Sequence, residues 1–328
     1  MTRRSSSTIL SSVAPPLLES RTNHLRARAC VALGALLFVC TLTPPVSAES
    51  PSTCGGARKF WSRVRQSPRD ATCALLLRAT ALVGSEPARA QLLAQQARTL
   101  APTPALRGEA RLVEGHAAFL LARPLDARAQ FDAARPEANH GWPATFRLSA
   151  ARTMLELGQP RWALEHYRVL FLEEGVLESR VQTRAWLEAA TAAMHAGDEF
   201  EIEARSYLAR AETSGDPLLA DWTRATRVLL VVREGQNELA RELVRGLSDR
   251  DALVWLIERH EDARRDGVLT PFLPRGEGLA LLAGLADARG EREAREAWQA
   301  YLDEAGTDVS ARVREAAQKR VVELARGR

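Results

Sequence analysis

The sequence repeats one spacing of small and apolar residues, and this repetition constrains the fold more than any other feature. In each full copy, three further small or apolar residues follow the first at steps of 12, 4 and 3. The full copies are Gly115, Ala127, Phe131 and Ala134; Ala151, Ala163, Tyr167 and Leu170; and Val228, Ala240, Val244 and Leu247. Partial copies are Ala90, Ala94 and Ala97; Gly197, Ala204, Leu208 and Ala211; and Gly290, Ala294, Trp298 and Tyr301. A chain that reuses a spacing in this way is built from repeated structural units.

The spacing is typical of pairs of helices. Steps of 3 and 4 place residues on one face of an α-helix. The position 12 residues earlier falls on the preceding helix, where a small residue lets the two helices approach closely. In the turn between them, Gly158 suits a left-handed helix end and Pro160 suits the first turn of the next helix. Each unit therefore predicts two antiparallel helices joined by a tight turn.

The unit length points to a known kind of repeat. The alanine near the start of each second helix recurs at positions 90, 127, 163, 204 and 240, and the fourth unit carries two extra residues after its turn. This pattern resembles the tetratricopeptide (TPR) repeat, whose period is about 34 residues. The resemblance implies an all-α fold, a right-handed α-solenoid of TPR-like hairpins ending in a C-terminal capping helix. An Ala/Leu-rich helical bundle with coincidental spacing is the alternative.

The sequence predicts five parts along the chain. They are a secretory signal peptide at 1–48, an N-terminal segment at 49–69, TPR-like repeats at 70–249, an irregular helix plus a degenerate repeat at 250–305, and a C-terminal capping helix at 306–328. Within the fourth part, residues 268–274 form an apolar stretch broken by two prolines. Such a stretch either packs against the helices or is exposed for a partner, and we favour packing.

The first 48 residues have the order of a secretory signal. Arg26 and Arg28 precede twelve apolar residues that end at Cys40, and small residues follow up to Ala48. Cleavage after Ala48 would leave a periplasmic protein, and a lipid anchor on Cys40 is the alternative. The apolar run is shorter than the roughly 20 residues that a spanning helix needs. We therefore expect no membrane-spanning segment in the mature chain.

The charge of the chain argues against nucleic acid as a partner. Residues 1–48 hold five arginines and one acidic residue, which accounts for the whole net charge of +4. The rest of the chain has 40 basic and 40 acidic residues and is neutral. A phosphate-binding surface needs an excess of positive charge on one face. We therefore expect no nucleic-acid binding.

Two cysteines lie beyond the leader, Cys54 and Cys73. An even number of cysteines in an exported protein is consistent with a disulfide. Such a bond would tie the N-terminal segment to the first helix, and two unpaired thiols are the alternative.

Sequence motifs for catalysis are absent. The chain has no G-x-S-x-G, H-E-x-x-H, phosphate-binding G-x-x-x-x-G-K-[ST] or C-x-x-C. The one tight group of possible metal ligands is His260, Glu261 and Asp262, which is more typical of a solvated helix face. We therefore predict no enzyme activity, no cofactor and no metal site.

The TPR resemblance also implies where a partner would bind. In TPR proteins the first helix of each pair lines a concave groove. The corresponding positions here are Glu109, His116, Arg152, Arg184, Thr191 and Trp222. They lack the Lys/Asn set with which chaperone-type TPR domains hold a C-terminal carboxylate. The resemblance thus implies a groove for an extended or helical protein segment.

These observations favour an exported, non-catalytic scaffold or adaptor that binds a protein segment in a cell-envelope assembly or transport system. Two alternatives stay open. One is a helical accessory protein of a peptidoglycan-acting envelope enzyme, and the other is an enzyme with an unrecognised site.

Overall fold

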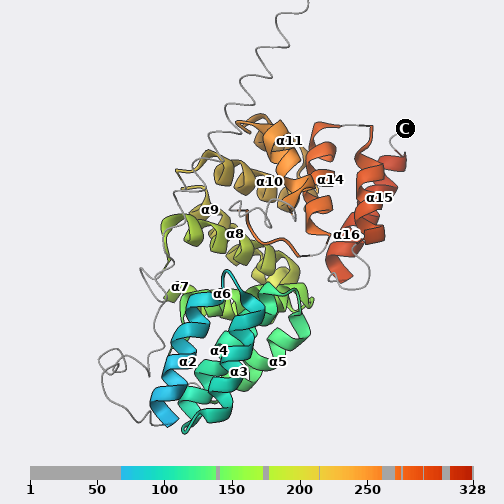
Figure 1. Cartoon of the computed structure of the whole chain (residues 1–328). Helices are drawn as coiled ribbons and strands as arrows, with labels where there is room; N and C mark the ends of the chain where they lie inside the picture. The colour runs from blue at the N-terminus through green and yellow to red at the C-terminus, as the bar shows by residue number, and fades with distance from the viewer. Residues whose placement is uncertain are drawn as a thin grey trace, which may run out of the picture. The chain divides into compact units, whose positions relative to one another are not determined.

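The fold is known from a computed structural model, and its regular elements in the described residues are all helices (Figure 1). The described residues are 68–137, 141–172, 177–213, 215–260, 270–274, 276–290, 292–304 and 311–326. The leader, its cleavage site at Ala48, Cys40 and Cys54 lie outside these ranges. None of the helices within them is long and apolar enough to cross a membrane. The all-α prediction is confirmed.

Consecutive helices pack as hairpins, as the spacing predicts. The pairs are α2 (Pro68–Leu82) with α3 (Pro87–Leu100), α4 (Pro104–Leu120) with α5 (Pro124–Ala134), α6 (Ala144–Glu156) with α7 (Pro160–Leu172), α8 (Ser179–Ala196) with α9 (Glu201–Ala211), α10 (Pro217–Arg233) with α11 (Asn237–Arg245), and α14 (Glu277–Arg289) with α15 (Ala294–Glu304). Outside the pairs lie α12 (Arg250–Glu258), α16 (Ala311–Arg326) and a short 3-10 helix, η3 (Asp198–Phe200). The helix η3 accommodates the two extra residues of the fourth unit.

The turns that follow α4, α6 and α10 have a left-handed backbone, as the sequence predicts at Gly158. Gly158 ends α6 with φ +64°, and Gly235 ends α10 with φ +76°. Ala122 occupies the same turn position after α4 with φ +54°, a conformation that is strained for a residue with a Cβ atom. The turn geometry is therefore kept even where the sequence does not supply glycine.

The repeated alanines lie where the two helices of each hairpin contact each other. Ala127, Ala163 and Ala204 are each fully buried. At the first full copy, a Cβ atom on Gly115 would lie 2.8 Å from Cε1 of Phe131. The ring of α5 thus occupies the space that glycine leaves on α4, which confirms the reason given for a small residue 12 positions before the alanine.

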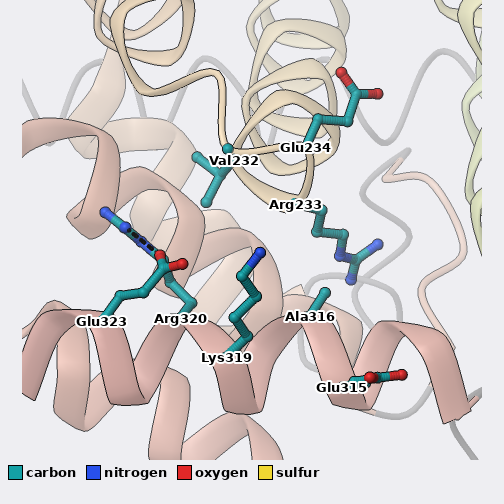
Figure 2. Close-up of a pocket in the computed structure, with 9 residues that line it drawn as sticks. Val232, Arg233, Glu234, Glu315, Ala316, Lys319, Arg320 and Glu323 are labelled. Carbon is teal, nitrogen blue, oxygen red and sulfur yellow. Dashed lines mark hydrogen bonds and ion pairs between the residues drawn. The ribbon is translucent and has the colours of Figure 1, made fainter.

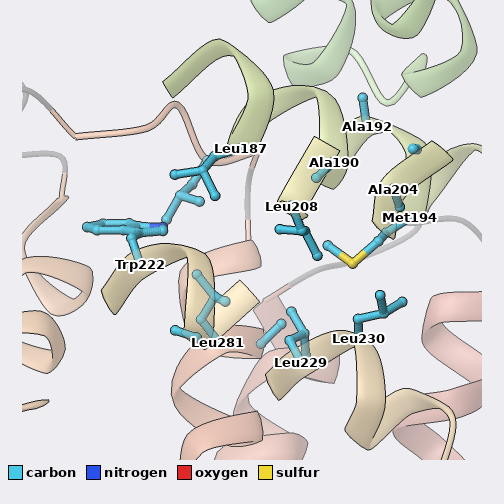
Figure 3. Close-up of a cluster of buried hydrophobic side chains, with 14 of the residues drawn as sticks. Leu187, Ala190, Ala192, Met194, Ala204, Leu208, Trp222, Leu229, Leu230 and Leu281 are labelled. Carbon is cyan, nitrogen blue, oxygen red and sulfur yellow. The ribbon is translucent and has the colours of Figure 1, made fainter. Parts of the chain in front are cut away.

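First and second helices differ in burial. The first helices α4, α8 and α10 bury most of their residues, whereas the second helices α5, α9 and α11 bury few. First helices also contact the first helix of a neighbouring hairpin, in the pairs α2 with α4, α4 with α6, α8 with α10, and α10 with α14. Figure 3 shows such packing, with Leu187 of α8, Trp222 and Leu229 of α10 and Leu281 of α14 in one cluster.

The C-terminal helix packs on two earlier helices. The helix α16 contacts α15 and α10, and its Ala317 is buried. Arg320 of α16 makes two hydrogen bonds to the buried carboxylate of Asp287 on α14, at 2.5 and 2.7 Å. Glu315, Lys319 and Glu323 lie on the exposed side of the helix. One polar face and one packed face are what the end of a helical stack requires.

Candidate functional site

The residues predicted to line a groove divide into two groups. Trp222, Thr191 and Arg184 are buried, with exposed fractions of 1%, 4% and 9%. Trp222 belongs to the main hydrophobic cluster, so in this structure it offers no surface to a partner. Glu109, His116 and Arg152 are half-buried on α4 and α6.

His116 belongs to the interface between α4 and α6. Its Nδ1 lies 2.7 Å from Oγ of Ser149, and its ring lies 5.3 Å from the ring of Phe146. Burial, with a smaller contribution from the charge of Arg152, lowers the pKa of His116 to about 4. The ring is therefore neutral at pH 7, and its contacts are those of a packed side chain.

Arg152 is half of a buried ion pair and not a free surface charge. Its Nε and Nη2 donate to Oε2 and Oε1 of Glu188 on α8, at 2.8 and 2.7 Å. The hydroxyl of Tyr167 donates to the same carboxylate at 2.9 Å. Burial and the nearby Glu188 carboxylate raise the pKa of Tyr167 well above its ordinary value, so the phenol keeps its proton. Glu188, which is fully buried, thus holds α6, α7 and α8 together.

A fourth donor reaches Glu188 from a distant part of the chain. The backbone N–H of Phe272 donates to Oε1 at 2.8 Å, although 84 residues separate the two. Residues 270–274, called the strap below, have no regular secondary structure. Within the strap Thr270, Phe272 and Leu273 are buried, with exposed fractions of 6%, 3% and 4%. The packed alternative for this proline-broken stretch is confirmed for the described residues.

The strap lies on a surface formed by two first helices. The ring of Phe272 lies 6.0 Å from that of Phe119 on α4, in a tilted arrangement. Arg184 lies one helical turn before Glu188 on α8, and its Nε makes one long hydrogen bond, 3.4 Å, to the carbonyl of Arg180. Burial lowers the pKa of Arg184, against the opposing effect of Glu188. Phe119 and Glu188 contact the strap, and Arg184 lies one helical turn from Glu188; we call these three residues the seat of the strap.

A second candidate is a cavity of about 250 Å³ between the end of α10 and α16 (Figure 2). The charges that line it are equal in number: three are basic and three are acidic. The basic residues are Arg233, Lys319 and Arg320, and the acidic residues are Glu234, Glu315 and Glu323. The cavity therefore has no net charge that would select an anion or a cation.

Arg233, at the edge of this cavity, also takes part in a buried cluster with Glu277 and His195. Nε2 of His195 lies 2.8 Å from Oε2 of Glu277, and Nη2 of Arg233 lies 3.6 Å from the same oxygen. Burial alone would raise the pKa of Glu277, but these two neighbours more than offset it and hold the pKa at about 2. The cluster joins α8, α10 and α14, so its role is to stabilise the packing of these three helices.

No group of three or more His, Cys, Asp or Glu side chains in the described residues could hold a metal ion. Of the predicted cluster at His260, the residues Glu261 and Asp262 lie outside those ranges. Cys73 is a buried free thiol on α2, and because Cys54 is not described the disulfide stays a prediction.

Comparison with known proteins found no family model, no curated protein and no solved structure that matches the chain.

The sequence pattern did not indicate Glu188, and it placed Arg152 on a groove without this partner. Arg184 and Glu188 are four residues apart on one helix, a spacing that is usually an exposed ion pair. The burial of Glu188 depends on Arg152, Tyr167 and Phe272, which come from three other segments, and no local pattern contains them.

Proposed function

We propose that this chain is an exported, non-catalytic interaction protein with a TPR-like architecture, and that its first helices present a surface to a segment of a partner protein. The observation that carries the proposal is the packing of first helices on first helices in four pairs, together with the lower burial of the second helices α5, α9 and α11. A right-handed α-solenoid of hairpins has this arrangement, because each unit is stabilised by its neighbours.

The proposed location is the periplasm. Support comes from residues 1–48, with their apolar run and small residues before Glu49. The neutral charge of the remaining chain supports a protein partner over a nucleic acid. An envelope assembly or transport system is the proposed setting.

The binding surface includes α8, and two positions of its hairpin allow a matched test. Arg180 lies on α8, one turn before Arg184, and its side chain is 60% exposed. Ile202 lies on the second helix α9 and is 83% exposed. A photo-crosslinking amino acid can replace either residue at little cost, because Ile202 is exposed and Arg180 loses only a surface ion pair with Asp216.

The experiment compares crosslinks from the two positions in intact cells. The proposal predicts a discrete protein adduct from position 180 and none from position 202. Equal adducts from both positions, or none from position 180 in cells that export the protein, would contradict it. Release of soluble fragments from cell-wall sacculi by the purified protein would instead favour an enzyme.

A further inference from the structure

The strap has the features of an extended peptide bound to a helical surface. It places one aromatic side chain, Phe272, against Phe119 of α4 and donates one backbone N–H to Glu188 of α8. Pro271 and Pro274 on either side have no N–H to donate. The strap therefore makes a small number of specific contacts and joins no helix or sheet.

The fit of the strap to its seat is incomplete. The hydroxyl of Thr270 is buried and makes no hydrogen bond to any of the described residues. A buried hydroxyl without a partner destabilises the state that contains it. Arg184, one helical turn from Glu188, is a second point to test, because its guanidinium makes one hydrogen bond of 3.4 Å, to a backbone carbonyl, and can take a carboxylate partner. A segment with an apolar side chain in place of Thr270 and a carboxylate near Arg184 would fit better.

The position of the Glu188 carboxylate does not depend on the strap. Glu188 accepts three hydrogen bonds from Arg152 and Tyr167, which fix its carboxylate whether or not Phe272 is present. An acceptor that is already in position loses little freedom on binding. Every residue except proline has a backbone N–H, so this acceptor selects an extended backbone and leaves the choice of side chain to the neighbouring contacts.

From these contacts we infer that the seat is the binding site for an extended segment of the partner protein, with an apolar or aromatic residue on Phe119 and an acidic residue near Arg184, and that this segment displaces the strap. The inference depends on the proposed function, because it names the part of the first-helix surface that binds and the chemistry of what it binds. The charges support an acidic segment, since Arg152, Arg184 and Glu188 together carry a net charge of +1.

The probe for this inference is the strap itself as a labelled synthetic peptide, residues 266–276, with the sequence DGVLTPFLPRG. Binding is measured by fluorescence anisotropy with the purified chain. The Phe272→Ala variant weakens the strap, and we expect it to bind the peptide at least tenfold more tightly than the wild type does. Ile202→Ala, which removes an exposed apolar side chain from α9, is the matched control and should behave as the wild type.

Two further changes test Thr270 and Arg184. Thr270→Val in the protein should hold the strap more firmly and reduce peptide binding below the wild-type level. In the peptide, glutamate is placed in turn at each position outside Pro271–Pro274, and any gain in affinity for the Phe272→Ala variant should be lost when the protein also carries Arg184→Gln. Circular dichroism shows whether each variant keeps its helices, and Thr270→Val is an isosteric change that preserves packing.

Three results would overturn the inference. They are no peptide binding by a folded Phe272→Ala variant, equal binding by the variant and the wild type, and no decrease with Thr270→Val. The proposed function would survive such a result if position 180 still gave a protein adduct in cells and position 202 did not. A loss of that adduct would contradict the proposed function whatever the peptide does.

Discussion

Replacing Glu188 with glutamine removes one negative charge from the point where four donors meet. The exposed fraction of Glu188 is 0%, and its partner Arg152 keeps a side-chain exposure of 20%. Breaking a buried ion pair at one end costs about 3–5 kcal/mol, because the other charge stays buried. The amide of glutamine still accepts hydrogen bonds through its oxygen but turns an NH₂ group toward the donors. We therefore expect the free energy of unfolding to fall by about 3 kcal/mol, the low end of that range.

Urea unfolding followed by far-UV circular dichroism measures this change. The control is Glu238→Gln, which removes an 85% exposed carboxylate paired with Arg241 and should change the free energy by less than about 0.5 kcal/mol. In a double-mutant cycle, Arg152→Met together with Glu188→Gln should cost at least about 1 kcal/mol less than the sum of the single changes. A Glu188→Gln variant as stable as the wild type, or an additive cycle, would refute the role given to this carboxylate.

Three further predictions concern a strained turn, a close helix contact and the buried carboxylate of Glu277. Ala122→Gly should raise the free energy of unfolding by up to about 1 kcal/mol, because glycine adopts a positive φ without strain. A decrease in that free energy, measured by urea unfolding, would contradict the positive φ of residue 122. Gly115→Ala should lower the free energy of unfolding by about 1–2 kcal/mol, because the new Cβ atom would lie 2.8 Å from the ring of Phe131. Gly284→Ala is the control and should be tolerated, because its new Cβ atom would lie 3.4 Å from the nearest atom. The depressed pKa of Glu277, about 2, contributes stability that is present above about pH 4.5 and is lost as the pH falls toward 2. Glu277→Gln should therefore remove about 3 kcal/mol of the difference in the free energy of unfolding between neutral and acidic pH. If the variant lost as much stability as the wild type between pH 4.5 and pH 2, the role given to the buried cluster would be wrong.

The features that could be predicted from the sequence are local or repeat at a fixed spacing. Gly158 and Pro160 mark a turn because their backbone preferences are intrinsic, and the structure has that turn. The step from Gly115 to Phe131 predicted a close helix contact because a hairpin brings those two positions together. The packing of Phe272 could also be expected, since an apolar stretch of this length is costly to expose.

The features that could not be predicted depend on contacts between distant segments. Trp222 was placed on a groove because its position corresponds to a groove position of TPR proteins, but in this chain α8 and α14 cover it. Arg152 has the sequence context of a solvated charge, and only the fold brings Glu188 to it. The burial of a side chain depends on every segment that packs around it. A pattern within one repeat therefore cannot predict that burial.

We propose that a first-helix surface of this chain binds an extended protein segment in the place where its own strap lies. Photo-crosslinking from position 180 in intact cells, compared between the wild type and the Phe272→Ala variant, tests this proposal. We expect a discrete partner adduct from position 180 that increases when Phe272 is removed. An adduct that stays the same, or that position 202 forms equally well, would contradict it.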